Sequence, residues 1–263
     1  MINKLFSYSL GQFRHAKDTR PNRVITELKD NHDELVREGV TILPEYFDKE
    51  TVNVMLSKLN ELTFTPTPEM RHDAKRPLAD KFFAQAEKIS EFSPFFSSTE
   101  LSQLIKSYIS VNAHMHRAFA RVKQDTGPVS SFENFYHFDA YKKRIKAFLY
   151  LTDVGPENAP VGFIKGTHIT QAWRLAREIE MFSNYQKDAG GYAADQESAY
   201  LGCYWPHEIK KLLHSKGFEP ITCTGKAGTV VIFDGKGLHL ANQLVADKRA
   251  VLVSHWIQPG HHM

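Results

Sequence analysis

The chain has 263 residues, of which 42% are hydrophobic, enough for one substantial core, and β folds of this length often form a single domain. Lys and Arg total 33 against 30 Asp and Glu, and they are spread along the chain, which argues against a nucleic-acid-binding protein. No window approaches the roughly 18 uninterrupted apolar residues of a membrane span, and the N-terminus lacks the pattern of a cleavable signal. We therefore expect a cytoplasmic protein that binds a small molecule but neither nucleic acid nor a membrane. The sequence leaves the oligomeric state open.

The cysteine content restricts the kind of metal site that the chain can build. Cys203 and Cys223 are too few for a disulfide framework or a cysteine-rich zinc site, as expected of a reduced intracellular protein. Any bound metal must therefore use histidines and carboxylates. The terminal His261 and His262 are left out of this argument, because such a pair also arises from expression tags.

The distribution of patterns along the chain predicts one domain over 1–263. We expect an N-terminal arm over 1–29, a flank of helices and loops over 30–110, and a β core over 111–257. A lid insertion is expected at about 170–220, where the stretch QKDAGGYAADQESAY is polar and contains glycine.

The flank opens with a helix, a short strand and a second helix between Asp30 and Leu62. Asp48 is a good N-cap for the second helix. Apolar residues then recur at helical spacing, namely Val52, Met55, Leu56 and Leu59. Phe64–Pro94 is rich in proline and charge, which predicts loop with short helical pieces.

From Val111 onward, short runs of β-branched and aromatic residues are separated by Gly, Pro, Asn and Asp. Strands are predicted at His116–Val122, Phe135–Tyr141, Ile145–Thr152, Gly162–Lys165, Thr229–Phe233, Leu238–Gln243 and Ala250–Ile257. Helices are predicted at Thr170–Phe182 and His207–Ser215. This strand density indicates a mainly β fold with flanking helices and a double-stranded β-helix (jelly-roll, cupin-like) core.

The segment NFYHFDAYKKRIKAFLYLTDV contains His137, Phe138 and Asp139. Side chains two residues apart on a strand point to the same face, so the imidazole and the carboxylate converge while Phe138 faces the other way. The spacing is typical of two metal ligands separated by a spacer. A triplet this short also arises by chance, so a second segment has to support it.

The run GTVVIFDGKGLHLANQLVADKRAVLVSHWI supplies that segment, with His239 and Arg249 on successive predicted strands. Two histidines and one carboxylate on one face of an octahedral metal leave three positions open, which suits iron(II) with a chelating ligand and O₂. Arg249 provides an anion clamp, because its planar guanidinium binds a carboxylate through two hydrogen bonds and stays charged when buried. An isolated arginine on a strand would be interpreted as a surface residue. Because Arg249 lies in the same run as His239, an anion-binding role is favoured.

These motifs make the chain resemble the phytanoyl-CoA dioxygenase-like (PhyH) family of Fe(II)/2-oxoglutarate-dependent oxygenases. REGVTILPEYFDKETVNVML resembles the family's opening, and FLYLTDVGPENAPVGFIKGTHI resembles its central strand pair. The resemblance implies that His137, Asp139 and His239 are the catalytic metal ligands and that Arg249 binds 2-oxoglutarate. It also implies Fe(II), 2-oxoglutarate and O₂ as cofactors, and hydroxylation of a C–H bond with decarboxylation of 2-oxoglutarate to succinate.

The sequence departs from the family pattern around the cosubstrate. Ala241 stands where members often carry Ser, and Phe135-Tyr136 precede the H-x-D where Trp or Gln is common. Further cofactor-binding contacts are expected on the strand after Asp139, from Lys146, Tyr150 and Thr152, with a solvent-facing side chain as the alternative for Lys146. His255 lies on the same face of the predicted strand as Arg249 and is expected to be a hydrogen-bonded core histidine.

Two other functions are compatible with the same residues. A His₂Asp site can bind zinc and activate water, so a metal-dependent hydrolase is an alternative, although Arg249 would then have no role. A non-catalytic jelly-roll ligand-binding protein is another. Asp139 argues against a halogenase, in which a small residue replaces the carboxylate. The substrate is not identified, but the polar lid favours a small polar metabolite.

Overall fold

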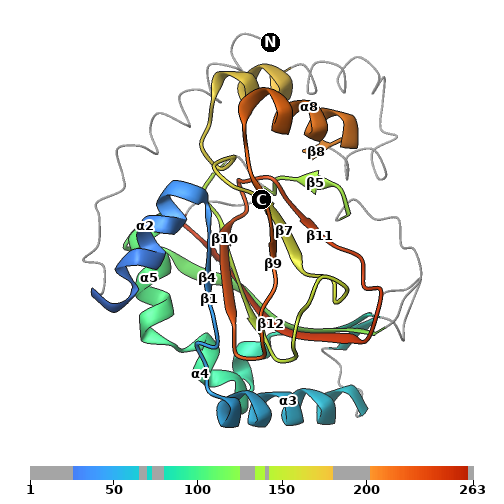
Figure 1. Ribbon diagram of the computed structural model, residues 1–263. Coiled ribbons are helices and arrows are strands. Elements are labelled where there is room, and N and C mark those ends of the chain that lie inside the picture. The colour runs from blue at the N-terminus through green and yellow to red at the C-terminus, as the bar shows by residue number, and fades with distance from the viewer. Residues whose placement is uncertain are drawn as a thin grey trace, which may run out of the picture.

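A computed structural model describes residues 26–64, 70–72, 80–124, 134–139, 142–179 and 202–259 (Figure 1). Two antiparallel sheets face one another, and helices cover the outside of the larger sheet. Within these ranges, no helix is long and apolar enough to cross a membrane. The predicted layers, a β sandwich with flanking helices, are therefore present.

Among the described residues, the larger sheet has seven strands and the smaller has five. The larger sheet has the order β1 (Val40–Leu43), β10 (Val230–Asp234), β6 (Ile145–Tyr150), β12 (Lys248–Ile257), β4 (His114–Gln124), β3 (Asp80–Ala84) and β2 (Met70–His72). The smaller sheet has the order β8 (Cys203–Tyr204), β5 (Tyr136–His137), β11 (His239–Ala241), β7 (Val161–Ile164) and β9 (Pro220–Cys223). Successive strands from β5 to β7 and from β10 to β12 alternate between the sheets, as in a jelly-roll.

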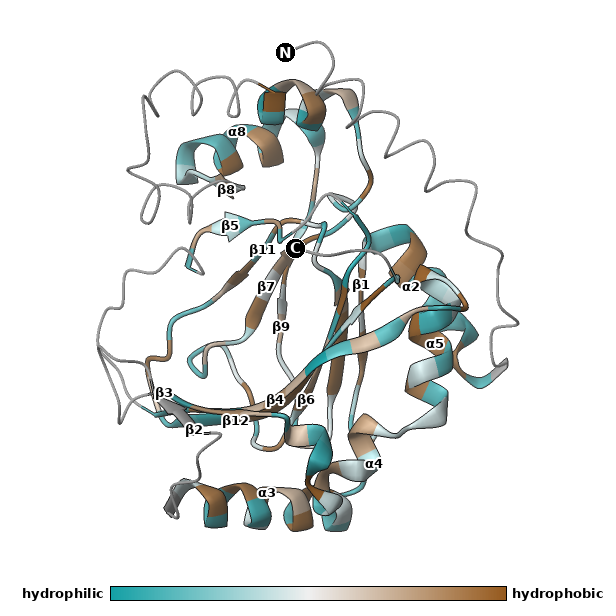
Figure 2. Ribbon diagram, turned by 180° about the vertical axis from the view of Figure 1, so that it is seen from behind, coloured by the Kyte–Doolittle hydropathy of each residue, from teal (hydrophilic) through white to brown (hydrophobic). Residues whose placement is uncertain are grey.

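The N-terminal flank forms the predicted helix, strand and helix. Its helices are α2 (Lys29–Glu38), α3 (Lys49–Phe64), α4 (Ser93–Phe96) and α5 (Thr99–Ile109), with 3₁₀ turns at Thr26–Leu28, Ala86–Lys88 and Ser90–Phe92. The N-cap prediction is confirmed, because the backbone N–H of Thr51 donates to Asp48 Oδ1 over 2.8 Å. Figure 2 shows apolar residues concentrated along the central strands, against which these helices pack.

The two faces of the larger sheet differ because alternate side chains point in opposite directions. The outward Leu149, Ala120 and Leu252 are buried in one cluster with the helices. Phe148 points inward and packs between the sheets with Phe163 of β7, yet it remains partly exposed. Solvent therefore reaches the inner face, where the two sheets oppose each other.

Gly39 joins the end of α2 to the body of the sandwich. It takes the left-handed conformation at φ 81° and its N–H donates to Leu35 O over 2.9 Å, which ends the helix. A Cβ on Gly39 would lie 2.4 Å from Nδ1 of His168. The buried His168 in turn bonds through Nε2 to Val36 O at 3.1 Å, so this histidine supports the junction.

The loop predicted for Phe64–Pro94 is wrong where β2 and β3 form. Residues 80–84 pair along the whole of their length with β4, so a long neighbouring strand stabilises a segment whose own pattern is too short to predict a strand. The strand predicted for Phe135–Tyr141 is also shorter, because the N–H of Asp139 donates to Gly235 O outside the ladder.

The C-terminal helix predictions agree where the structure describes them. Residues 172–179 are helical inside the segment Thr170–Phe182, and α8 (Pro206–Lys216) covers the second predicted helix. The polar stretch 186–200 proposed as a lid, residues 1–25 of the arm and the terminal His261 and His262 lie outside the described residues.

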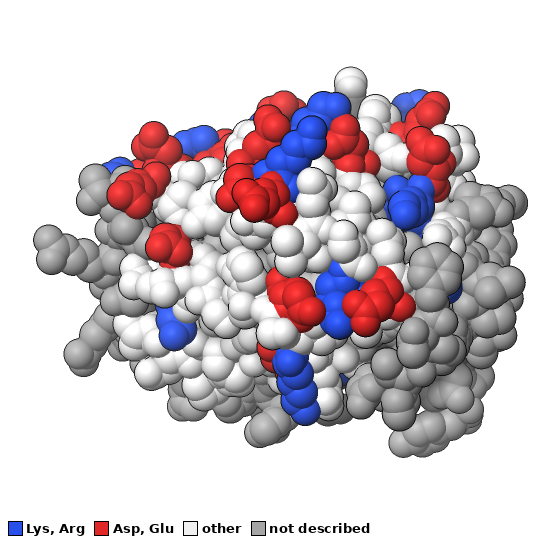
Figure 3. Space-filling view, turned by 90° about the horizontal axis from the view of Figure 1, so that it is seen from below, with Lys and Arg blue, Asp and Glu red and all other residues white. Residues whose placement is uncertain are grey.

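The face around α3 carries both signs of charge in alternation (Figure 3). Lys58 is one of these residues, and it pairs with Glu61 at 3.2 Å and with Glu91 at 3.5 Å. Such exposed pairs contribute little to stability.

Both cysteines are buried, and burial raises the pKa of Cys203 to about 11 and that of Cys223 to about 12. At pH 8 we expect both thiols of the native chain to react with a disulfide reagent at least about 100-fold more slowly than in denaturant, because little thiolate is present. A colorimetric thiol assay with and without guanidinium measures this. Rapid labelling of the native chain would contradict the burial of these strands.

Candidate metal centre

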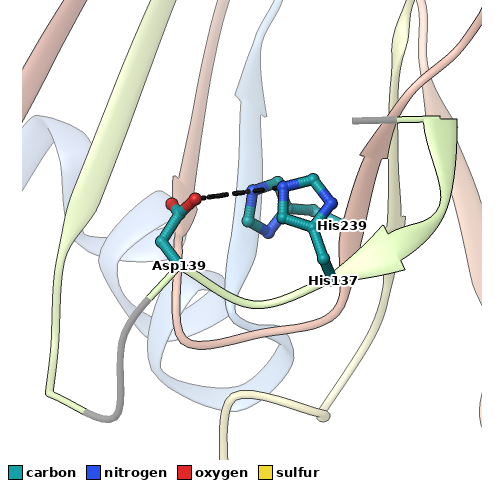
Figure 4. Close-up of side chains that lie close together, drawn as sticks. All are labelled: His137, Asp139 and His239. Carbon is teal, nitrogen blue, oxygen red and sulfur yellow. Dashed lines mark ion pairs between the residues drawn. The ribbon is translucent and has the colours of Figure 1, made fainter. Parts of the chain in front are cut away.

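His137 and His239 are brought together by the pairing of β5 with β11. They are directly opposed in the antiparallel register, and their ring centroids lie 4.4 Å apart. Asp139, two residues beyond His137, reaches the same point from just beyond β5 (Figure 4). One ligand atom from each of the three residues lies within 4.8 Å of the other two. The convergence predicted from the H-x-D and the distal histidine is therefore present.

The orientation of both imidazoles is fixed by their own backbone. Nδ1 of His137 bonds to Phe135 O at 2.8 Å, and Nδ1 of His239 bonds to Gly237 O at 3.0 Å. Since a carbonyl only accepts, each Nδ1 carries the proton and each Nε2 keeps its lone pair for a metal. Burial, and then the neighbouring His239, lower the pKa of His137 to about 4, so this ring is neutral at physiological pH.

Asp139 occupies a space that a larger neighbour would fill. A Cβ on Gly235 would lie 2.5 Å from Asp139 Oδ2, so glycine is needed at that position. Asp139 Oδ1 lies 3.9 Å from Nε2 of His137 and 3.6 Å from Nε2 of His239. Burial disfavours the carboxylate, but the ammonium of Lys146 and the imidazole of His239 outweigh it and hold the pKa of Asp139 well below its usual range.

Lys146 lies against the three ligands. Its Nζ is 2.8 Å from Asp139 Oδ2, 3.0 Å from Oδ1 and 3.4 Å from Nε2 of His239. An ammonium and a metal compete for the single lone pair of that nitrogen, so Lys146 has to leave His239 when a metal binds. Its side chain is 16% exposed and comes from the inner face of β6, which leaves it room to move.

The donor set fits iron(II). Two neutral imidazole nitrogens and one carboxylate oxygen approach from one side, which is the arrangement of a facial triad, and no sulfur donor takes part. The same donors also suit zinc, so the ligands alone do not choose between redox and hydrolytic chemistry.

The structure does not bring Arg249 into contact with the triad. Arg249 is 2% exposed at the start of β12, and its Nη1 donates to Ala159 O. Ala159 itself has a left-handed φ of 55°, which presents this carbonyl to the arginine. The positive charge of Arg249 also acts on Tyr150, which places it near the opposite end of β6 from Lys146.

The other predicted cofactor contacts lie in different places. Lys146 is at the metal ligands. The Tyr150 hydroxyl donates to Cys223 O over 2.6 Å between the sheets, close to Arg249. The Thr152 hydroxyl accepts the N–H of Ala250 at 3.2 Å, one residue beyond Arg249. Tyr150 and Thr152 thus lie at the arginine end, and their contact with 2-oxoglutarate stays a prediction.

The sequence did not indicate Arg174, which is 1% exposed on the helix at 172–179. Its Nη1 donates to Thr167 O and to Lys236 O, each over 2.6 Å, and its Nε donates to Glu178 at 2.5 Å. Its guanidinium also lies 4.7 Å from the ring centroid of Phe138, the spacer between the two ligands. One side chain therefore joins the H-x-D strand to the turn before His239.

Asp234 was also not singled out, and it fixes the same turn. Its Oδ1 accepts the N–H groups of Arg144 at 3.2 Å and Lys236 at 2.9 Å. Its Oδ2 accepts the hydroxyl of Tyr108 at 2.7 Å from α5. The aspartate in an FDG run was the available signal, since a buried carboxylate at a turn has to bind local N–H groups.

Comparison with known proteins gives a family match over most of the chain. Residues 35–250 match the family "Phytanoyl-CoA dioxygenase (PhyH)". The ectoine dioxygenase of Bordetella parapertussis is 21% identical over 221 residues, which cover 80% of this chain and 68% of that protein.

Solved structures share the fold. The epimerase SnoN in complex with Fe3+, alpha ketoglutarate and nogalamycin RO has a TM-score of 0.61 at 15% identity, covering 88% of this chain and 84% of its own. EctD from S. alaskensis with 2-oxoglutarate and 5-hydroxyectoine has a TM-score of 0.61 at 16% identity, covering 87% and 75%. The carbocyclase SnoK has a TM-score of 0.59 at 15% identity, covering 88% and 83%.

These matches confirm the predicted double-stranded β-helix fold. With the His–Asp–His site, the family match also confirms iron(II), 2-oxoglutarate and O₂ as the expected cofactors. The reaction type is that of a non-haem iron, 2-oxoglutarate-dependent oxygenase. The matched residues extend from α2 to β12 and include all three converging ligands. The chain belongs to the phytanoyl-CoA dioxygenase family.

Proposed function

We propose that this oxygenase hydroxylates a C–H bond of a small metabolite and converts 2-oxoglutarate to succinate and CO₂. The observation that carries the proposal is the convergence of His137 Nε2, His239 Nε2 and the Asp139 carboxylate on one point. These residues would hold iron(II), which supplies the oxidising chemistry with 2-oxoglutarate and O₂. A cytoplasmic location and a small-molecule substrate belong to the same proposal.

The protein's own contribution is to orient ligands and to separate charges. Backbone carbonyls hold both imidazoles in the metal-binding tautomer, and Gly235 leaves space for the Asp139 carboxylate. Lys146 balances that carboxylate and would move toward the anionic cosubstrate when iron replaces it at His239. Arg249 would hold the distal carboxylate of 2-oxoglutarate after its contact with Ala159 O opens.

The related proteins differ in the product of the reaction, so the product formed by this chain is itself a proposal. SnoN is an epimerase and SnoK a carbocyclase, whereas the ectoine dioxygenase is named for dioxygenation. The same fold therefore serves several products, and the position of the substrate decides which bond reacts. Hydroxylation is proposed here because the relative matched by sequence is named a dioxygenase.

Anaerobic titration of the iron(II)-loaded protein with 2-oxoglutarate tests the proposed chelate. A weak visible charge-transfer band is expected, because 2-oxoglutarate would chelate the iron. The band should disappear in His239→Ala, whose fold is checked by circular dichroism. Absence of the band from iron-loaded wild type would support the hydrolase or the binding protein instead, and activity without O₂ would identify the hydrolase.

Replacement of Arg249 should weaken the binding of 2-oxoglutarate but leave metal binding intact. Removing a charge-assisted contact costs about 2–3 kcal/mol, so Arg249→Lys should raise the 2-oxoglutarate concentration for half-saturation of the band by roughly 30-fold or more. Lysine keeps the buried charge, and thermal unfolding reports whether the fold survives. An unchanged 2-oxoglutarate requirement would remove Arg249 from this role.

Arg174 should affect metal affinity by positioning the ligands, because it does not contact the metal itself. Arg174→Met breaks the link between Phe138 and the turn before His239, so cobalt(II) should bind about 10-fold more weakly and with an altered visible spectrum. Arg174→Lys should recover part of the affinity. Leu104→Ala in α5 is the control, because it lowers stability without touching this link. Equal cobalt spectra in Arg174→Met and wild type would show a purely structural role.

A further inference from the structure

A row of cationic side chains crosses the larger sheet beside the metal centre. His255 of β12 is the register partner of Lys146 on β6 and of Arg117 on β4. Directly opposed residues in antiparallel strands point to the same face with Cβ atoms about 5 Å apart. Since Lys146 contacts Asp139, the row extends from the metal ligands to Arg117 along the inner face.

Arg144 adds a fourth member to this row. It lies directly before β6, and its charge acts on His255, which places it close to the same row. Both arginines act on His255: burial first, then Lys146, and to a smaller extent Arg144 and Arg117 bring the pKa of His255 down to about 3, against the opposing effect of Asp139. The imidazole is therefore neutral and can serve as a hydrogen-bond partner among the side chains of Lys146, Arg144 and Arg117.

Solvent and ligands can reach this row. Arg117 is exposed, and Lys146, Arg144 and His255 are half-buried. The alternate residues Ala118 and Ala147 are buried against the helices on the other side of the sheet. The cations thus point into the side of the sheet that faces the metal centre and not into the core.

The charges of the row are not balanced by protein groups that the structure describes. Asp139 pairs with Lys146, but a metal would take over that carboxylate. Arg117 and Arg144 form no ion pair within the described residues. Adjacent like charges with little compensation favour an anionic ligand, which would gain charge-assisted hydrogen bonds from two guanidinium groups.

An aromatic surface lies next to the same row. Phe119, which follows Arg117 on the inner face of β4, makes a T-shaped contact with His255 at 5.4 Å between ring centroids. Its other side stacks on Phe82 of β3 at 4.5 Å. Phe119 remains partly exposed, so it offers an apolar surface between the cations and the edge strand.

We propose that the substrate is a small organic oxyanion whose carboxylate or phosphate binds Arg117 and Arg144 beside His255, while its apolar part contacts Phe119. This inference rests on the proposed function. It assigns the cosubstrate to Arg249 and the substrate to the Arg117 row, so that two anions bind at opposite ends of the inner face. A neutral or cationic substrate would leave the row unbalanced.

Matched probes test the proposal without turnover. The full chain is loaded with manganese(II) and saturating 2-oxoglutarate, and binding of phenylacetate, phenyl phosphate and the neutral phenylacetamide is measured by calorimetry. At least one anion should bind about 10-fold or more tightly than the amide. The preferred anion then distinguishes a carboxylate from a phosphate substrate. Equal binding of all three probes would overturn the proposal.

Variants of the two arginines test whether they cause the preference for anionic probes. Arg117→Gln and Arg144→Gln should each reduce the anion preference several-fold, and the double variant should abolish it, with unchanged thermal stability because both side chains are solvent-accessible. Arg37→Gln, at an exposed arginine on α2, is the matched control and should keep the full preference. Retention of the preference in the double variant would overturn the proposal.

The cosubstrate titration separates this inference from the proposed function. If Arg117→Gln raises the 2-oxoglutarate requirement about 10-fold, the row is part of the cosubstrate site and the substrate inference is wrong, although the oxygenase proposal stands. If wild type gives no charge-transfer band with iron and 2-oxoglutarate, the oxygenase proposal fails, and the anion preference is still decided by calorimetry with manganese alone.

Discussion

The site depends on one constraint, the direct opposition of His137 and His239 across the β5–β11 pair. Because the two residues share a register position, their side chains emerge on one face without any adjustment of the backbone. Each ring then bonds to the carbonyl two residues before it, so the tautomer is set by the strand itself. Asp139 and the turn before His239 are secured by additional contacts from Gly235, Asp234 and Arg174. A shift of either strand by one residue would turn its histidine to the other face.

Burial of three metal ligands creates an electrostatic problem that the larger sheet resolves. A carboxylate removed from water is costly unless a cation accompanies it. Lys146 reaches across from β6 to supply that cation and also touches His239. The fold therefore holds Asp139 in place through Lys146, and a bound metal would substitute its own positive charge for that of the ammonium. Lys146 would then be available to an anionic ligand beside the site.

The sequence was sufficient for features that depend on local periodicity and ligand chemistry. Strand parity predicted that His137 and Asp139 converge, and apolar spacing with Asp48 predicted α3. Features that depend on which strands lie side by side in a sheet could not be predicted from the sequence. The strand at residues 80–84 is stabilised by β4, which lies more than thirty residues later. Arg174 resembles any charged residue on an amphipathic helix until the fold buries it over Phe138. Lys146 was singled out for the cosubstrate, yet its contact with Asp139 required the register between the sheets.

The two sheets divide the chemistry between them. The smaller sheet and the residues just beyond it supply the histidines and the carboxylate, whereas the inner face of the larger sheet supplies the positive charges at Lys146, Arg117 and Arg249. A dianionic cosubstrate and a metal with one carboxylate ligand need such an arrangement, since the anions have to be compensated where water is limited. The outer face of the larger sheet is packed by helices, while side chains of the inner face such as Lys146 and Phe148 remain partly exposed. Specificity can then change through β3, β4 and their side chains, because the ligand strands β5 and β11 lie in the other sheet.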